Sequence, residues 1–415
     1  MINLLYDCYR VLGKVYGEGT YLKQALTETD TEPKNRAAVA KICYGVLDND
    51  GLLNYYIARL AKKTPKLSVR IVLKCAMYAI KFLHKKPYAV ADGAVELMKK
   101  MGKGGASGFV NASLRRFAAE DIPLPAENTE RLSVQYSYPM FALKRLIERY
   151  GAERAEKIIS AECGVTTLCF YETDGEKYLK EHNAEFERTP FYNVFNLRRF
   201  TRNKDYDNGV YTFQALPSVA ICDAAEACEK LLDCCAAPGG KSVRMSYKCG
   251  EVLSWDVHPH RVELIKSYGA RMGRKNITAE LQDASVFRPE LAFSFDAVLC
   301  DAPCTGLGVV RDDPDIKLNR TEQNLFELVK KQRDILDGVC GYVKKGGYLY
   351  YSTCSVLYEE NSGQIKDFLS RHKEFEPCRT GSPLPHETDE FGMTFLPDIS
   401  GGLGFYTAKL KRTEK

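Results

Sequence analysis

The stretch "LDCCAAPGGKS", Leu232–Ser242, decides the fold of this chain, because it joins an apolar strand to a glycine-rich turn and then to a helix. The same rhythm recurs downstream in "EVLSWD", "NITAEL", "FDAVLCD" and "YLYYSTCS", with helical stretches between most of them. A final alternating run, "GFYTAKLKR", reads as one more strand. Strands that alternate with helices predict a doubly wound, Rossmann-like α/β sheet.

Residues 235–242, "CAAPGGKS", come close to the phosphate-binding pattern G-x-x-x-x-G-K-[ST]. Gly240, Lys241 and Ser242 match, but Cys235 stands where the first glycine is required. A phosphate loop needs the backbone freedom of that glycine and a run of N–H donors, and Pro238 removes one donor. A nucleotide triphosphatase is therefore the weaker alternative, and we expect a loop that binds another ligand.

Acidic residues stand at or just beyond the ends of four predicted strands: Asp233, Asp256, Asp283 and Asp301. In open α/β sheets, ligands bind beyond the carboxyl ends of the strands. A single acid there is explained by helix capping. Four acids in register favour a ligand rich in hydroxyl and amino groups, with positive charge, such as S-adenosylmethionine.

Two cysteines follow the later strands, Cys304 in "DAPCTGLG" and Cys354 in "YSTCS". Each, taken alone, is explained as a buried structural thiol. Beside a methyl donor they gain a specific purpose, because a thiolate is a strong nucleophile. Its attack on carbon 6 of cytosine makes carbon 5 able to accept a methyl group, and Asp301 supplies an acid beside the ring. The pattern alone leaves open which of the two thiols attacks.

Composition indicates an ordinary globular protein of 415 residues, with 45% hydrophobic and 27% charged residues. We expect no signal peptide and no membrane span, because long apolar runs are missing. The 15 cysteines include no C-x-x-C pair, and His258 and His260 have no cysteine pair near them. We therefore expect no metal site and a chain that works in the reducing cytoplasm.

Positive charge is concentrated in residues 1–120, which hold 20 Lys and Arg against 10 Asp and Glu. The apolar spacing of residues 69–83 predicts helices, and Arg70, Lys74, Lys81 and Lys85 form a basic stripe beside it. A polyanionic partner and a merely solvated face are both compatible with this charge. We expect three domains: an all-helical domain at 1–122, a small α+β domain at 128–205, and the Rossmann-like domain at 206–415.

Three motifs together resemble the Sun-type (RsmB/NOP) family of RNA cytosine-5 methyltransferases. They are "LDCCAAPGGKS", "FDAVLCDAPCTGLGVVRDDPDIK" and "YYSTCSVLYEEN". Residues 1–120 are similar to the NusB RNA-binding fold, on the stretches "KNRAAVAKICYGVL" and "GFVNASLRRF". The resemblance implies an enzyme that methylates RNA, with ribosomal RNA of the small subunit as the first choice. We expect the enzyme to be a monomer. Transfer RNA, and a non-catalytic role in ribosome assembly, remain the alternatives.

The resemblance also implies roles for individual residues. Cys354, in the "T-C-S" motif, would be the nucleophile, Cys304 would assist product release, and Asp301 would face the target base. S-adenosylmethionine would be bound by Cys235, Ala236, Ala237, Pro238, Gly239, Gly240, Lys241, Asp256, Arg261, Asp283 and Asp301. The chain departs from the family pattern at "QALPS" (214–218), "CFY" (169–171), Asp312 and "LGFY" (403–406). We expect these changes to remove phosphate contacts rather than the chemistry.

Overall fold

The structure, a computed structural model, describes residues 2–413 and divides into two compact units. The helical unit comprises the chain up to residue 159 together with residues 310–321. The sheet unit comprises residues 160–309 and the chain from residue 322 onward. We call residues 310–321 the return segment, because there the chain leaves the sheet unit and contributes to the helical unit before it goes back. The division into three domains, with the boundaries given above, stays a prediction.

The helical unit is built from amphipathic helices, as the spacing of residues 1–120 predicts. Val69, Val72, Leu73 and Ala76 are all buried on one of them. The helices are α1 (Ile2–Glu18), α2 (Leu22–Glu28), α3 (Arg36–Asp48), α4 (Asp50–Leu60), α5 (Leu67–Lys81), α6 (Pro87–Lys100), α7 (Ser107–Ala119), α8 (Asn128–Gln135), α9 (Met140–Tyr150), α10 (Ala152–Ser160) and, within the return segment, α16 (Ile316–Asn319).

The basic stripe predicted on α5 is wrong at Lys74. Its side chain is only 4% exposed, and its Nζ lies 2.5 Å from Oδ1 of Asp50. Burial lowers the pKa of Lys74, although Asp50 opposes that shift. An ammonium group removed from water needs such a partner, so Lys74 stabilises the helical core and offers no charge to a polyanion.

The return segment is held on the helical unit through Asp48, the last residue of α3. Lys317 donates to Asp48 with an Nζ–Oδ1 distance of 2.6 Å, and its side chain is only 4% exposed. Arg311 pairs with the same carboxylate at 3.1 Å and also donates to the carbonyl of Ile159. Asp315 accepts the backbone N–H of Leu22, the first residue of α2. Polar contacts of this kind fix the segment although it is remote in sequence.

The sheet unit contains a small antiparallel sheet in the order β2-β3-β1-β4. Strands β1 and β3, in the stretches "TTLCFY" and "YNVFNL", pair from Thr166–Leu197 to Cys169–Val194. Aromatic rings including Phe170, Tyr178 and Tyr211 fill its core. Its elements are β1 (Thr166–Cys169), α11 (Gly175–Glu181), β2 (Glu187–Arg188), β3 (Val194–Leu197), α12 (Lys204–Asp207) and β4 (Thr212–Phe213).

The large sheet has nine strands, with the path β11-β12-β13-β9-β8-β5-β6-β7 and β10 paired to β13. Strands β5 to β9 are parallel, and β13 runs antiparallel beside β9. The strands are β5 (Cys228–Asp233), β6 (Cys249–Asp256), β7 (Ile277–Leu281), β8 (Phe295–Asp301), β9 (Val343–Thr353), β10 (Phe375–Cys378), β11 (Glu387–Thr388), β12 (Met393–Phe395) and β13 (Phe405–Arg412).

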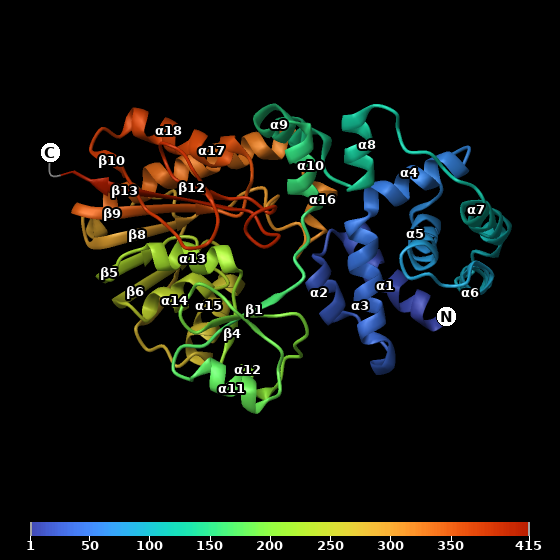
Figure 1. Ribbon diagram of the computed structural model, residues 1–415, viewed down its shortest axis with the longest axis horizontal. Coiled ribbons are helices and arrows are strands. Elements are labelled where there is room, and N and C mark those ends of the chain that lie inside the picture. Colours follow the sequence, from blue (N-terminus) through green and yellow to red (C-terminus); the bar gives the residue numbers. More distant parts are fainter. Residues whose placement is uncertain (1, 414–415) are drawn as a thin grey trace. The chain divides into compact units, whose positions relative to one another are not determined.

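Helices cover both faces of this sheet, as a doubly wound fold requires (Figure 1). Residues alternate between the faces: Leu231 packs with α13 and α14, whereas Leu232 packs with α17 and α18. The helices are α13 (Leu216–Ala224), α14 (Gly240–Ser246), α15 (Pro259–Arg271), α17 (Glu322–Val339) and α18 (Ser362–Arg371). The predicted α/β class, with an all-helical part and a small α+β part before it, is confirmed. Within residues 2–413, no helix combines the length and apolar character that a membrane crossing demands.

Candidate active site

The predicted site residues gather where the parallel strands end. Asp233 ends β5, Asp256 ends β6, Asp301 ends β8, and Cys354 directly follows β9. Strand β5 lies between β6 and β8, so the chain turns to opposite sides of β5 at this point. That arrangement is the switch point at which open α/β sheets bind their ligands.

The loop Cys234–Gly239 connects β5 to α14, and backbone hydrogen bonds anchor it. Ala236 donates its N–H to the carbonyl of Trp255 at 2.8 Å, and Gly239 donates to Ala236 at 2.7 Å. Gly239 has φ of 110°, which disfavours any residue with a side chain. A Cβ atom there would also lie 3.3 Å from Cα of Ile265. Gly239 therefore allows the tight entry into α14.

Lys241, on the first turn of α14, reaches Asp301 at the end of β8. Its Nζ donates to Oδ2 of Asp301 at 2.7 Å, and Ser352 on β9 donates to Oδ1 at 2.6 Å. Burial would lower the pKa of Lys241, but the Asp301 carboxylate outweighs it and raises that pKa above its usual value. The lysine therefore stays charged, and its contact and that of Ser352 hold the Asp301 side chain between α14 and β9.

Arg261, on α15, connects Asp256 to the loop. Its guanidinium lies 3.3 Å from Oδ2 of Asp256 and donates to the carbonyl of Ala237 at 3.3 Å. The other carboxylate oxygen of Asp256 accepts the N–H of His258 at 3.0 Å. Asp256 is thus buried at the end of β6 with a partner for each carboxylate oxygen.

Asp233 and Asp283 differ from the other strand-end acids. Asp233 is completely buried beneath the loop, where Ser242 donates to Oδ2 at 2.6 Å and Oδ1 has no hydrogen-bond partner. Burial raises the pKa of Asp233 to about 7. Asp283 lies two residues beyond β7 and accepts the N–H and hydroxyl of Ser285, which lower its pKa. The structure therefore brings Asp256 and Asp301 into the loop network and uses Asp233 as its support, while Asp283 forms a local turn.

The two predicted thiols meet directly. The Sγ atoms of Cys304 and Cys354 are 3.2 Å apart, and both residues are partly exposed. The hydrogen bond with Cys354, together with burial, raises the pKa of Cys304 well above its usual value. Cys304 is therefore a protonated thiol at neutral pH.

Glu360, which sequence reasoning missed, connects the two loops that carry the thiols. It is fully buried and accepts the N–H of Thr305 at 2.7 Å and the hydroxyl of Ser355 at 2.5 Å. The Thr305 hydroxyl and the amide of Gln332 on α17 also donate to it. Burial raises the pKa of Glu360 against the effect of these donors. The only sequence signal was its place six residues after Cys354 inside the third motif.

Backbone hydrogen bonds of Gly308 and Gly404 hold the loops that carry Cys304 and Cys354 together. Gly308 donates to the carbonyl of Cys354 at 2.9 Å, and Gly404 donates to the carbonyl of Gly308 at 2.7 Å. A Cβ atom on Gly308 would lie 2.1 Å from the carbonyl oxygen of Gly404. A Cβ atom on Gly404, the glycine of "LGFY" just before β13, would lie 3.0 Å from Cα of Gly308, so close packing of the Cys304 loop requires glycine there as well.

Family models match both parts of the chain. Residues 220–411 match the 16S rRNA methyltransferase RsmB/F model, and residues 4–119 match the NusB family model. The chain is 30% identical to "Probable ribosomal RNA small subunit methyltransferase B" of Bacillus subtilis (strain 168), covering 94% of each protein. It is 29% identical to the ribosomal RNA small subunit methyltransferase B of Klebsiella pneumoniae, covering 99% of this chain and 98% of that one.

Solved structures share the fold. PH0851 superposes with a TM-score of 0.83 at 23% identity, covering 99% of both chains. A structure of NSun6 from Pyrococcus horikoshii with SFG gives a TM-score of 0.58 at 19% identity and covers 67% of this chain and 99% of that one. At these identities the likeness concerns the fold alone.

Proposed function

Because this chain belongs to the RsmB/F family of 16S rRNA methyltransferases, we propose that it methylates carbon 5 of a cytosine in small-subunit ribosomal RNA. The methyl donor is S-adenosylmethionine, and Cys354 forms a transient covalent bond to the base. The observation that carries this proposal is the pair of thiols 3.2 Å apart, at the sheet edge that also holds the Lys241–Asp301 pair.

The residues at the edge fit S-adenosylmethionine by their chemistry. Carboxylates suit its hydroxyl and ammonium groups, and the loop Cys235–Lys241 opens a helix in the position at which such folds bind nucleosides. The donor would be held by this loop together with Asp256, Arg261, Asp283 and Asp301. When bound, it supplies an electrophilic methyl group for carbon 5.

The chain's own residues activate the base. The Cys354 thiolate forms a bond to carbon 6, and the electron pair of the 5,6 double bond becomes available at carbon 5. Asp301 stabilises the adduct from the side of ring nitrogen 3. After methylation, the carbon 5 proton passes to water, the electron pair it leaves restores the 5,6 double bond, and the sulfur–carbon bond breaks to return the Cys354 thiolate. Cys304 assists this release, and its raised pKa keeps it from competing as the nucleophile.

The cytosine must leave its stack to reach the thiols, so the target is a flipped base in a loop or bulge. The helical unit, with its NusB match and excess of basic residues, is the part of the chain we assign to RNA binding. We also predict that the enzyme is a monomer and that it works in the cytoplasm.

Trapping of a covalent intermediate tests the roles of the thiols. Cys304→Ala should accumulate a protein–RNA adduct that survives denaturing electrophoresis, whereas Cys354→Ala should form none. The opposite result would reverse the two roles.

Mapping of methylcytosine tests the substrate. Bisulfite sequencing of a deletion strain should show one 5-methylcytosine lost from small-subunit ribosomal RNA and restored by the intact gene. If the lost 5-methylcytosine lies in transfer RNA, transfer RNA is the substrate. If no 5-methylcytosine is lost, only the assembly-factor alternative remains. For that alternative, calorimetry should show no S-adenosylmethionine binding.

A further inference from the structure

Three potential metal ligands converge at the end of the sheet unit remote from the thiols. Cys340, His372 and Glu374 place a sulfur, a ring nitrogen and a carboxylate oxygen within 4.8 Å of one another. Cys340 follows α17, His372 follows α18, and Glu374 immediately precedes β10. Strand β9 begins at Val343, so this cluster lies at the opposite end of that strand from Cys354.

The spacing of these atoms suits one tetrahedral ion. The Cys340 Sγ to His372 Nδ1 distance is 3.7 Å, and the Nδ1 to Glu374 Oε1 distance is 3.3 Å. Around a tetrahedral zinc ion, the known bond lengths place a sulfur and a nitrogen ligand about 3.6 Å apart and nitrogen and oxygen about 3.3 Å apart. Both distances therefore agree with a shared ion, and the sulfur and the carboxylate oxygen lie within 4.8 Å of each other.

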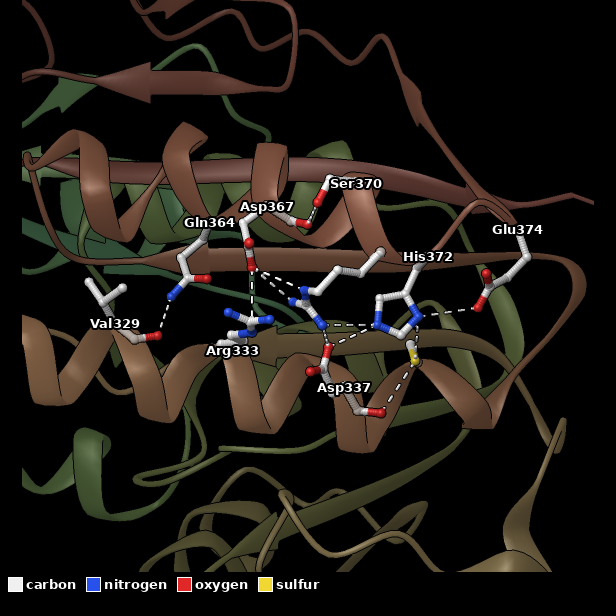
Figure 2. A network of polar contacts seen from close by, with 10 residues as sticks. Val329, Arg333, Asp337, Gln364, Asp367, Ser370, His372 and Glu374 are labelled. Carbon is white, nitrogen blue, oxygen red and sulfur yellow. Dashed lines mark hydrogen bonds and ion pairs between the residues drawn. The ribbon is translucent and has the colours of Figure 1, made fainter.

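The other ring nitrogen of His372 already contacts a carboxylate. Its Nε2 lies 2.8 Å from Oδ1 of Asp337, and the ring stacks on Phe368 with centroids 4.4 Å apart. Figure 2 shows His372 between Asp337 on one side and Glu374 on the other. A carboxylate that receives the Nε2–H leaves the Nδ1 lone pair directed at the cluster, which is the usual support of a metal-binding histidine.

The charges around this cluster favour a divalent cation. Helices α17 and α18 both end here, and helix carboxyl ends favour positive charge. A Cys340 thiolate, Glu374 and Asp337 carry three negative charges, of which a dication would offset two, and Arg371 pairs with Asp337 as well as with Asp367. Arg412 is the other nearby cation, and it donates to the carbonyl of Cys340 rather than to its sulfur.

We propose that Cys340, His372 and Glu374 bind one thiophilic divalent cation of the Zn²⁺ type, which ties the ends of α17, α18 and β10 together. Coordination displaces the thiol proton of Cys340, which now faces the carbonyl of Asp337 at 3.4 Å. Glu374 is about one third exposed, which leaves room for water as a fourth ligand. This proposal departs from the expectation of no metal, which rested on cysteine spacing alone.

X-ray absorption at the zinc edge, on the full-length, tag-free chain with one equivalent of Zn²⁺, tests the site. We expect a shell of one sulfur and three nitrogen or oxygen atoms. Cys340→Ala and His372→Gln should each weaken Zn²⁺ affinity at least 100-fold in a competition titration. Asp337→Asn, which removes the supporting carboxylate, should weaken it about 10–100-fold. The matched control is Cys378→Ala, a partly exposed cysteine of β10, which should bind as the wild type does.

Two results would overturn the proposal. A two-sulfur shell that survives Cys340→Ala would place the ion at another cysteine pair, such as Cys304 and Cys354. Affinity too weak to measure in the wild type would mean that His372 serves only to connect Asp337 and Glu374. If Cys340→Ala does not fold, Glu374→Gln tests the site instead, because Glu374 is only about one third exposed but lies at the surface of the cluster. This variant should bind Zn²⁺ more weakly, while its thermal unfolding without zinc should equal that of the wild type.

Discussion

Among single residues, Asp233 has the most unusual environment, because its carboxyl is fully buried and one oxygen has no partner. The pKa of about 7 exceeds the ordinary 3.8, so the folded state holds an additional proton between these values. The free energy of unfolding should therefore fall as pH rises from about 4 to about 7, by at most an amount on the order of 4 kcal/mol. Above pH 7 this contribution levels off.

Asp233→Asn should remove that dependence, because an amide does not titrate in this range. Urea unfolding at several pH values should show the wild type losing stability relative to the variant as pH rises through this window. Asp283→Asn is the control with the opposite sign. Its pKa is lowered, so the wild type should lose stability relative to that variant only as pH falls below about 4. Parallel curves for wild type and Asp233→Asn would contradict the assignment.

Glu360 is a positioning residue for both thiol loops. In Glu360→Gln, the new amide would face donors from Thr305 and Ser355, which would leave buried groups unsatisfied at a cost of about 1–3 kcal/mol. We expect adduct formation to slow at least tenfold while the affinity for RNA changes little. Single-turnover kinetics separates the two quantities. The neighbouring Glu359→Gln should leave the rate unchanged, and an equal loss there would mean that position 360 has no special role.

Among the elements, the loop after β8 depends on close backbone packing. Gly308→Ala would bring a methyl group 2.1 Å from the Gly404 carbonyl and 2.8 Å from that of Cys354. Overpacking of this kind costs about 1–3 kcal/mol, and it should lower adduct yield at least tenfold because the loops are forced apart. Gly381→Ala is the control, since nothing lies within 4 Å of its added Cβ. Normal adduct yield in Gly308→Ala would show that the loops move independently.

The elements also show what sequence can and cannot predict. Apolar runs such as "FDAVLCD", bounded by turn residues, identified the parallel strands and hence the edge that collects Asp256, Asp301 and the thiols. Parallel strands place their carboxyl ends together, so a local pattern sufficed there. Glu360 and the Cys340 cluster escaped prediction because their partners come from separate helices and loops, and no periodicity records which helix ends meet. Lys74 was misassigned because helical spacing does not reveal a buried partner such as Asp50.

For the whole molecule, Asp48 is the residue on which the return segment depends. Asp48→Ala would leave the buried Lys317 without its counter-charge, at a cost of about 3–5 kcal/mol to the helical unit. Adding Lys317→Met should recover part of that loss. Trp255, the only tryptophan, lies buried on β6 of the sheet unit, so its fluorescence reports that unit. We expect Asp48→Ala to shift the far-ultraviolet circular dichroism transition but not the fluorescence transition, and a joint shift would contradict independent unfolding.

The return segment also sets an order of events on the ribosome. The helical unit emerges first, yet Lys317 and Arg311, which pair with Asp48, are translated only after the strands up to β8. At ordinary elongation rates, the roughly 150 residues between positions 159 and 310 delay them by about 8–30 s. During that interval Asp48 lacks its ion-pair partners Arg311 and Lys317. The helical unit is therefore completed only when the return segment has been synthesised.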